Sequence, residues 1–191
     1  MAKVSEKTIS NLLMEYKKYV LNKGNWINYC KINWYGKKSQ KQITEAITRF
    51  CDKESEFFKN NDHTRRVYRT AMENLKKKLL PCIPVIKKMK TFDDIYQFIA
   101  KLNVKGIGNG LTAYDISLLL SSCIGLDLDK EPQYVYPHAG TAVGINNLCG
   151  LPKSRRKPYK INELDVGLNN VFTKSKLSPA HLEHFFCIIK I

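Results

Sequence analysis

Two closely spaced glycines, Gly106 and Gly108, separate two segments whose patterns are typical of helices. Before the glycines, Thr91 is a candidate N-cap for a run of apolar residues at helical spacing. After them, a strongly apolar run ends at Gly125. Because glycine admits backbone conformations that a side chain blocks, such a turn leaves the N–H groups at the next helix start uncovered. The sequence therefore predicts a helical hairpin over residues 91–125 that can hold an anion.

The turn resembles the helix-hairpin-helix DNA-binding element through Val104, Gly106, Ile107 and Gly108, followed by a small residue, Thr112 or Ala113. In that family the hairpin amides bind one DNA phosphate without reading base sequence. The residues that the resemblance implies for phosphate binding are Val104, Lys105, Gly106, Ile107, Gly108, Asn109 and Gly110. Family members often hold a monovalent cation on hairpin carbonyls, so the resemblance admits such a cation here. No other cofactor is expected.

The chain carries a strong excess of positive charge, with 32 Lys and Arg against 17 Asp and Glu and a formal net charge of +15. Phosphate neutralisation dominates nucleic-acid affinity, so a polyanionic partner is the simplest explanation. A basic proteome background or a solvated surface is the alternative. The basic residues expected to contact a phosphate backbone, besides the hairpin, are Arg65, Arg66, Arg69, Lys153, Arg155, Arg156 and Lys157. The expected partner is nucleic acid, with duplex DNA favoured over RNA by the resemblance alone, and no membrane.

Residues 127–141 combine carboxylates, tyrosines and a histidine. The chain also resembles the helix-hairpin-helix DNA glycosylase superfamily, in which a catalytic aspartate follows the hairpin within a Val-Asp-x-His sequence. Here Tyr136 stands in the place of that aspartate, and Gly110 or Leu111 stands in the place of the lysine nucleophile of bifunctional members. A bifunctional enzyme is therefore not expected.

A monofunctional glycosylase would need a carboxylate and a pocket for an extruded base. The candidate catalytic residues are Asp127, Asp129, Tyr136 and His138. The alternative for the two acids is a role at the end of the preceding helix, and for His138 a structural hydrogen bond.

The segment from Leu111 to Leu148 also resembles a type of small, uncharacterised bacterial protein. In these proteins Tyr-Asp, Val-Tyr-x-His-Ala-Gly and a following helix recur. The resemblance implies no activity. It suggests instead that five residues form a constellation distinct from glycosylase chemistry, namely Tyr114, Asp115, Tyr136, His138 and Gly140.

The whole chain, residues 1–191, is expected to form a single all-α domain with a glycosylase-like helical bundle, because it has no internal repeat or low-complexity linker. Beyond the hairpin, helices are expected over residues 5–23, 39–59, 62–80 and 140–148 and after Ser178. The aromatic segment 26–35 alternates in part and is expected to be a short extended piece or an irregular loop.

The six cysteines are scattered singly and lack a CxxC spacing, which favours reduced core residues over a disulfide framework, a zinc site or an iron–sulfur site. His181 and His184 flank Glu183 on a predicted helix, but no third ligand has diagnostic spacing, so no metal site is expected. The chain also has no long apolar run and no signal-peptide region, which favours a cytoplasmic location.

The predicted function is DNA binding without sequence specificity, through the hairpin and the basic surface. The first alternative is a monofunctional base-excision glycosylase. The second is a protein-interaction subunit of a nucleic-acid complex, in which the basic face serves assembly.

Overall fold

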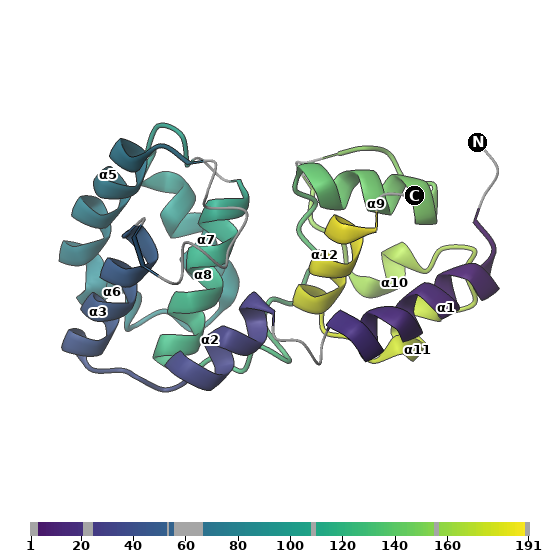
Figure 1. The fold of residues 1–191 in the computed structure, drawn as a ribbon, viewed down its shortest axis with the longest axis horizontal. Coiled ribbons are helices and arrows are strands. Elements are labelled where there is room, and N and C mark those ends of the chain that lie inside the picture. Colours follow the sequence, from purple (N-terminus) through teal and green to yellow (C-terminus); the bar gives the residue numbers. More distant parts are fainter. Residues whose placement is uncertain are drawn as a thin grey trace. The chain divides into compact units, whose positions relative to one another are not determined.

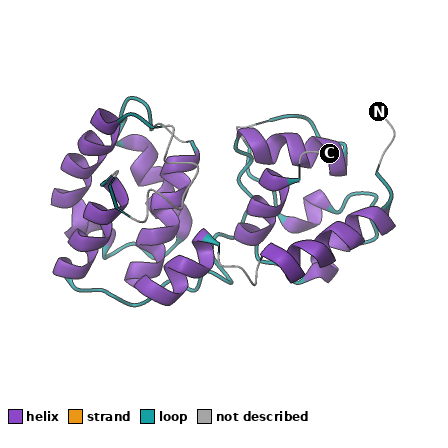
Figure 2. Ribbon diagram, viewed as in Figure 1, coloured by secondary structure: helices purple, strands orange, loops and turns teal. Residues whose placement is uncertain are grey.

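A computed structural model describes residues 4–20, 25–52, 54–55, 67–107, 110–154 and 157–189. Within these residues the regular structure is helical, and the β pairing is an isolated bridge between Val135 and Tyr159 (Figure 2). The expected all-α class is therefore confirmed. None of the described helices combines the length and the apolar character that a membrane crossing requires.

The contacts of the chain divide it into two compact units. The hairpin unit comprises Trp26–Leu128, and the terminal unit comprises Met1–Asn25 together with Asp129–Ile191. The chain passes from one unit to the other twice, after Asn25 and after Leu128. Units connected in this way need not fold separately, so the single domain expected from the sequence stays a prediction.

The hairpin unit is built around α8 (Leu111–Ile124), in which every residue from Thr112 onward is buried. A helix that is enclosed on all sides is a core helix, and α8 packs against three of its neighbours. The other elements of the unit are α2 (Trp26–Trp34), α3 (Gln40–Cys51), α5 (Arg69–Leu79), the 3₁₀ turn η4 (Leu80–Cys82), α6 (Ile83–Ile86) and α7 (Phe92–Lys101) (Figure 1).

The two helices of the predicted hairpin begin and end where local signals place them. Thr91 caps α7 by accepting a hydrogen bond from the Asp94 backbone N–H, and the Asp94 carboxylate accepts one from the Thr91 N–H in return. At its other end α8 stops at Gly125, whose φ of +87° is left-handed.

The segment that was expected to be extended or irregular, residues 26–35, forms α2 instead, so that prediction was wrong. Ile27, Cys30 and Trp34 recur at helical spacing and bury one face of the helix. Trp26 and Tyr29 stack beside them with ring centroids 5.6 Å apart. The partial alternation of aromatics masked this helical spacing. Asp62, the expected cap of the next helix, lies outside the described residues.

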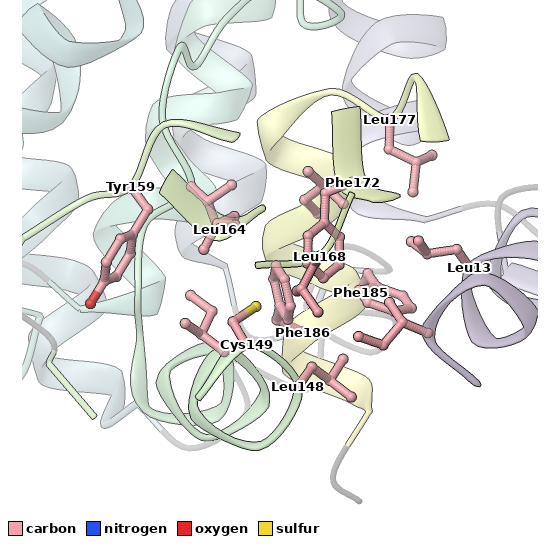
Figure 3. Close-up of a cluster of buried hydrophobic side chains, with 14 of the residues drawn as sticks. Leu13, Leu148, Cys149, Tyr159, Leu164, Leu168, Phe172, Leu177, Phe185 and Phe186 are labelled. Atoms are coloured by element: carbon pink, nitrogen blue, oxygen red, sulfur yellow. The ribbon is translucent and has the colours of Figure 1, made fainter. Parts of the chain in front are cut away.

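The terminal unit packs its helices around a cluster of phenylalanines (Figure 3). Phe186 lies 5.1 Å from Phe172 and 5.4 Å from Phe185 between ring centroids. The elements of the unit are α1 (Glu6–Glu15), the π-helical turn η1 (Tyr16–Val20), α9 (Ala139–Cys149), α10 (Ile161–Leu164), α11 (Val171–Ser175) and α12 (Pro179–Ile188). The serine cap and first-turn proline expected for the last helix are confirmed by Ser178 and Pro179.

Candidate nucleic-acid interface

The turn between α7 and α8 is held in place by two apolar side chains. Val104 and Ile107 are only 5% and 6% exposed, and the Ile107 N–H donates to the Val104 carbonyl at 3.0 Å. Between them Gly106 adopts a φ of +89°, and a Cβ added there would lie 3.3 Å from the Cβ of Ala71 on α5. The turn therefore needs glycine at this position, both for its conformation and for its contact with α5.

The start of α8 has no side-chain cap. Gly110 occupies the N-cap position, its N–H donates to the Ile107 carbonyl at 3.3 Å, and its own carbonyl accepts from the Tyr114 N–H. The N–H groups of a first helical turn have no partner within the helix, and the helix dipole makes that end attractive to anions. Lys105 is exposed in the same turn. This arrangement suits one phosphate group.

The carbonyls at the beginning of the turn bind a cation that belongs to the protein itself. The ammonium of Lys78, on α5, donates to the Leu102 carbonyl at 2.6 Å and lies 3.5 Å from the Asn103 carbonyl. The Val104 and Ile107 carbonyls accept backbone N–H groups. Because a carbonyl oxygen has two lone pairs, these contacts leave room for an ion, and a monovalent cation at the hairpin stays a prediction.

The described basic candidates outside the hairpin, Arg69, Lys153 and Lys157, are exposed, and two of them form surface ion pairs. Arg69 lies 2.9 Å from Glu54 in the hairpin unit, and Lys157 lies 3.1 Å from Glu163 in the terminal unit. Exposed pairs of this kind contribute little and can exchange for a phosphate. Lys153 is exposed in the same loop as Lys157. The candidates that lie outside the described residues are Arg65, Arg66, Gly108, Asn109, Arg155 and Arg156.

The four candidate catalytic residues are distributed over both units. Asp127 is half-buried near the end of the hairpin unit, whereas Asp129 is exposed at the start of the following terminal-unit segment. Tyr136 and His138 are 4% and 8% exposed, and the His138 N–H donates to the Tyr136 carbonyl at 3.0 Å. His138 is also the N-cap residue of α9, where its carbonyl accepts from the Ala142 N–H. The structure thus brings Tyr136 and His138 together in a buried helix start.

The five-residue constellation is divided between the units in the same way. Tyr114 and Asp115 are buried in α8 of the hairpin unit. Tyr136, His138 and Gly140 belong to the terminal unit, at the start of α9. Gly140 has a packing role there, because a Cβ at this position would lie 2.9 Å from the Cys187 sulfur.

The terminal unit contains a buried carboxylate, Glu183, that the sequence analysis did not predict to lie in the core. Glu183 on α12 is 4% exposed and accepts a hydrogen bond of 2.6 Å from the Thr141 hydroxyl on α9. Burial, together with the nearby Glu183 charge, raises the pKa of Tyr16 well above its usual range. The sequence feature that could have predicted this buried carboxylate is that Glu183 is the single acidic residue in the apolar sequence of α12.

The histidines that flank Glu183 form hydrogen bonds to hydroxyl groups. His184 Nδ1 lies 3.0 Å from the Tyr16 hydroxyl, and His181 Nδ1 lies 2.9 Å from the Ser178 hydroxyl. In the part of the chain that the structure describes, no group of three or more His, Cys, Asp or Glu side chains could hold a metal ion. The His184 contact joins α12 to Tyr16 of η1, whereas the His181 contact lies at the start of α12.

Comparisons with protein-family models, with curated proteins and with solved structures found no match for this chain. The resemblance to the helix-hairpin-helix element therefore depends on the turn itself. That resemblance stays a prediction; in the structure Val104 and Ile107 are buried, Gly106 is left-handed and the start of α8 has no side-chain cap.

Proposed function

We propose that the protein binds duplex DNA without reading its sequence, by placing a backbone phosphate at the start of α8. The observation that carries this proposal is the uncapped N-terminus of α8 beside the exposed Lys105. Val104 and Ile107 are buried and hold residues 104–107 in place, so these residues lose little conformational entropy when a phosphate binds. Backbone amides and one ammonium contact phosphate oxygens alone, and such contacts carry no base information.

The charge of both units supports a polyanionic partner. The hairpin unit contains 18 Lys and Arg against 10 Asp and Glu, and the terminal unit contains 14 against 7. A field of one sign attracts a duplex from a distance and increases the association rate. Arg69, Lys153 and Lys157 are the described basic residues that we assign to further backbone contacts. The proposal retains the cytoplasmic location expected from the sequence, where duplex DNA is accessible.

Base excision is not included in this proposal. Tyr136 and His138 are buried at the start of α9, and Asp127 belongs to the other unit. A catalytic group must reach the sugar of an extruded nucleotide. A panel of lesion-bearing duplexes tests this exclusion. If the protein releases a modified base, and Asp127→Asn or Asp129→Asn abolishes the release, then the protein is an enzyme and not only a DNA-binding module.

Fluorescence anisotropy with two labelled duplexes of unrelated sequence tests the proposal. We expect the two dissociation constants to agree within about twofold and to rise steeply with salt, because phosphate contacts release counterions. Failure to bind either duplex at low salt, or a strong preference for one of them, would overturn the proposal.

A further inference from the structure

Two adjacent pockets of the hairpin unit are bordered by lysines that the sequence did not connect to one another. The first, of about 560 Å³, extends along α7, and the second, of about 280 Å³, lies at the C-terminal end of α8. Met89 and Lys90 line both pockets, and we call the two pockets together the lysine groove. Its basic residues are Lys38, Lys87, Lys88, Lys90 and Lys101.

The positive charge of the lysine groove exceeds its negative charge. All five lysines are exposed, and no described residue forms an ion pair with any of them. Asp93 and Asp94 border the groove at the first turn of α7, and the Asp94 carboxylate is occupied by the Thr91 capping box. Five ammonium groups around the lysine groove repel each other, so an anionic occupant lowers the free energy of the surface.

The groove also has an apolar lining, which distinguishes it from a simple basic surface. Met89 and Phe98 are half-buried walls of the larger pocket, and Ile124 and Leu126 border the smaller one. A duplex presents its phosphates on a convex surface and keeps its bases stacked inside. A single strand exposes phosphates and flat apolar bases together, and proteins bind it with a basic groove and an aromatic stacking surface.

One end of the lysine groove lies next to the hairpin turn. Lys101 is the last residue of α7 and precedes the turn directly, while Gly125 borders the groove at the far end of α8. The groove thus extends over about the length of α8, roughly 20 Å at 1.5 Å per residue. A strand that leaves a duplex held at the turn can continue into it.

We propose that the lysine groove binds a single strand of nucleic acid, with phosphates on its lysines and a base against Phe98. The inference deepens and rests on the proposed function, because it makes the preferred ligand a duplex with a single-stranded extension. Lys87 and Lys90, which precede α7, and Lys38, which precedes α3, all line the smaller pocket. The strand is therefore held from two elements of the fold.

Anisotropy with a blunt duplex and with the same duplex carrying an extension of about ten nucleotides tests the inference. In the wild-type protein we expect the extension to tighten binding about tenfold, because it adds phosphate contacts. The double variant Lys87→Gln/Lys90→Gln should lose this gain and still bind the blunt duplex. The charge-matched control Lys7→Gln/Lys174→Gln, at exposed lysines of the terminal unit, should retain the gain.

A second variant separates stacking from charge. Phe98→Leu keeps an apolar side chain but removes the ring, so it should lose part of the gain in affinity that the extension provides. It should not weaken binding to an extension in which every base has been removed. Equal weakening toward both extensions would overturn the base contact that we assign to Phe98.

The outcomes also separate the inference from the proposed function. If the wild-type protein binds the blunt duplex but gains nothing from the extension, the groove assignment is wrong and the proposed function stands. If it binds no duplex, the proposed function fails and the inference fails with it. An equal loss of heparin binding in Lys87→Gln/Lys90→Gln would show a general polyanion surface and overturn the assignment to a strand.

Discussion

The ammonium of Lys78 on α5 donates a hydrogen bond of 2.6 Å to the carbonyl of Leu102, the C-cap residue of α7. The last carbonyls of a helix have no partner within the helix, and a positive charge near them is favourable. The same bond joins α5 to the beginning of the hairpin turn. One lysine therefore stabilises the end of a helix and helps to fix the loop that follows it.

Replacing Lys78 by methionine removes this ammonium and keeps most of the apolar stem. We expect Lys78→Met to lower the free energy of unfolding by about 0.5–1 kcal/mol, since the bond is charge-assisted but exposed. Thermal or urea unfolding measures the change. The control is Lys77→Met, the neighbouring exposed lysine on α5. Equal destabilisation by the two variants would contradict a specific role for Lys78.

Gly106 and Gly36 both have left-handed backbone conformations, but only Gly106 has a close neighbour at the position of an added Cβ. Gly36 can therefore serve as the control for Gly106. Their φ values are +89° and +70°, and an added Cβ would contact Ala71 at 3.3 Å in the first case and nothing within 4 Å in the second. Gly36→Ala should therefore cost about 1 kcal/mol of backbone strain. Gly106→Ala should cost more, about 2 kcal/mol, because the turn must also move away from α5.

Chemical denaturation of the two glycine variants measures this difference. A cost for Gly106→Ala that does not exceed the cost for Gly36→Ala would show that the contact with Ala71 does not restrict the turn. Because Gly106 lies beside Lys105, the same variant should also weaken duplex binding. Gly36→Ala should leave duplex binding unchanged.

Gly144 allows α9 and α12 of the terminal unit to approach closely. A Cβ at this position would clash with the backbone carbonyl oxygen of Phe186, so the two helices would have to separate. We expect Gly144→Ala to destabilise the protein by about 3 kcal/mol or more, at the upper end of overpacking costs. Gly140→Ala meets the end of the Cys187 side chain instead, at 2.9 Å, and should cost less. Similar costs in calorimetry would contradict this difference.

Much of the hairpin could be predicted from the sequence because its signals are local. The Thr91 capping box and the left-handed Gly125 each depend on a few neighbouring residues. The lysine groove depends on packing between distant segments instead. Lys38 reaches the smaller pocket because the Gly36 N–H donates to the Ser122 carbonyl at 2.9 Å, at the end of α8. No short-range pattern encodes that contact.

The same distinction holds for the polar core of the terminal unit. Thr141 and Glu183 lie on different helices, and their hydrogen bond forms only when α9 and α12 pack together. The π-helical turn Tyr16–Val20 also departs from the single helix expected over residues 5–23. Its Tyr16 hydroxyl contacts His184, a partner far away in the sequence. Such contacts depend on how distant helices pack together, so local sequence patterns do not predict them.

Burial makes several cysteine thiols unreactive. It raises the pKa of Cys51 and of Cys123 to about 12, in each case partly offset by a nearby lysine. At pH 8 we expect a thiol reagent to label the half-buried Cys82 and Cys187 first. Cys51 and Cys123 should react only after unfolding. Rapid labelling of all six cysteines in the folded protein would contradict this burial.

The two raised thiol pKa values also predict a loss of stability in alkali. In the unfolded chain these thiols ionise near their ordinary pKa of 9.0, whereas in the folded protein they stay neutral up to about 12. Their contribution to stability is complete below pH 9 and decreases as the pH rises from 9 toward 12. Urea unfolding at pH 8 and pH 10.5 measures this decrease. In Cys51→Ala/Cys123→Ala the alkaline decrease should be smaller.

The salt dependence of duplex binding, compared between the wild-type protein and Lys105→Gln, tests the central claim most directly. If the hairpin turn holds a phosphate, the plot of log K against log salt concentration should lose about 0.9 from its slope in the variant, the contribution of one phosphate contact. The control Lys174→Gln, at an exposed lysine of the terminal unit, should keep the wild-type slope. A slope in Lys105→Gln equal to that of the wild-type protein would contradict phosphate binding at the turn.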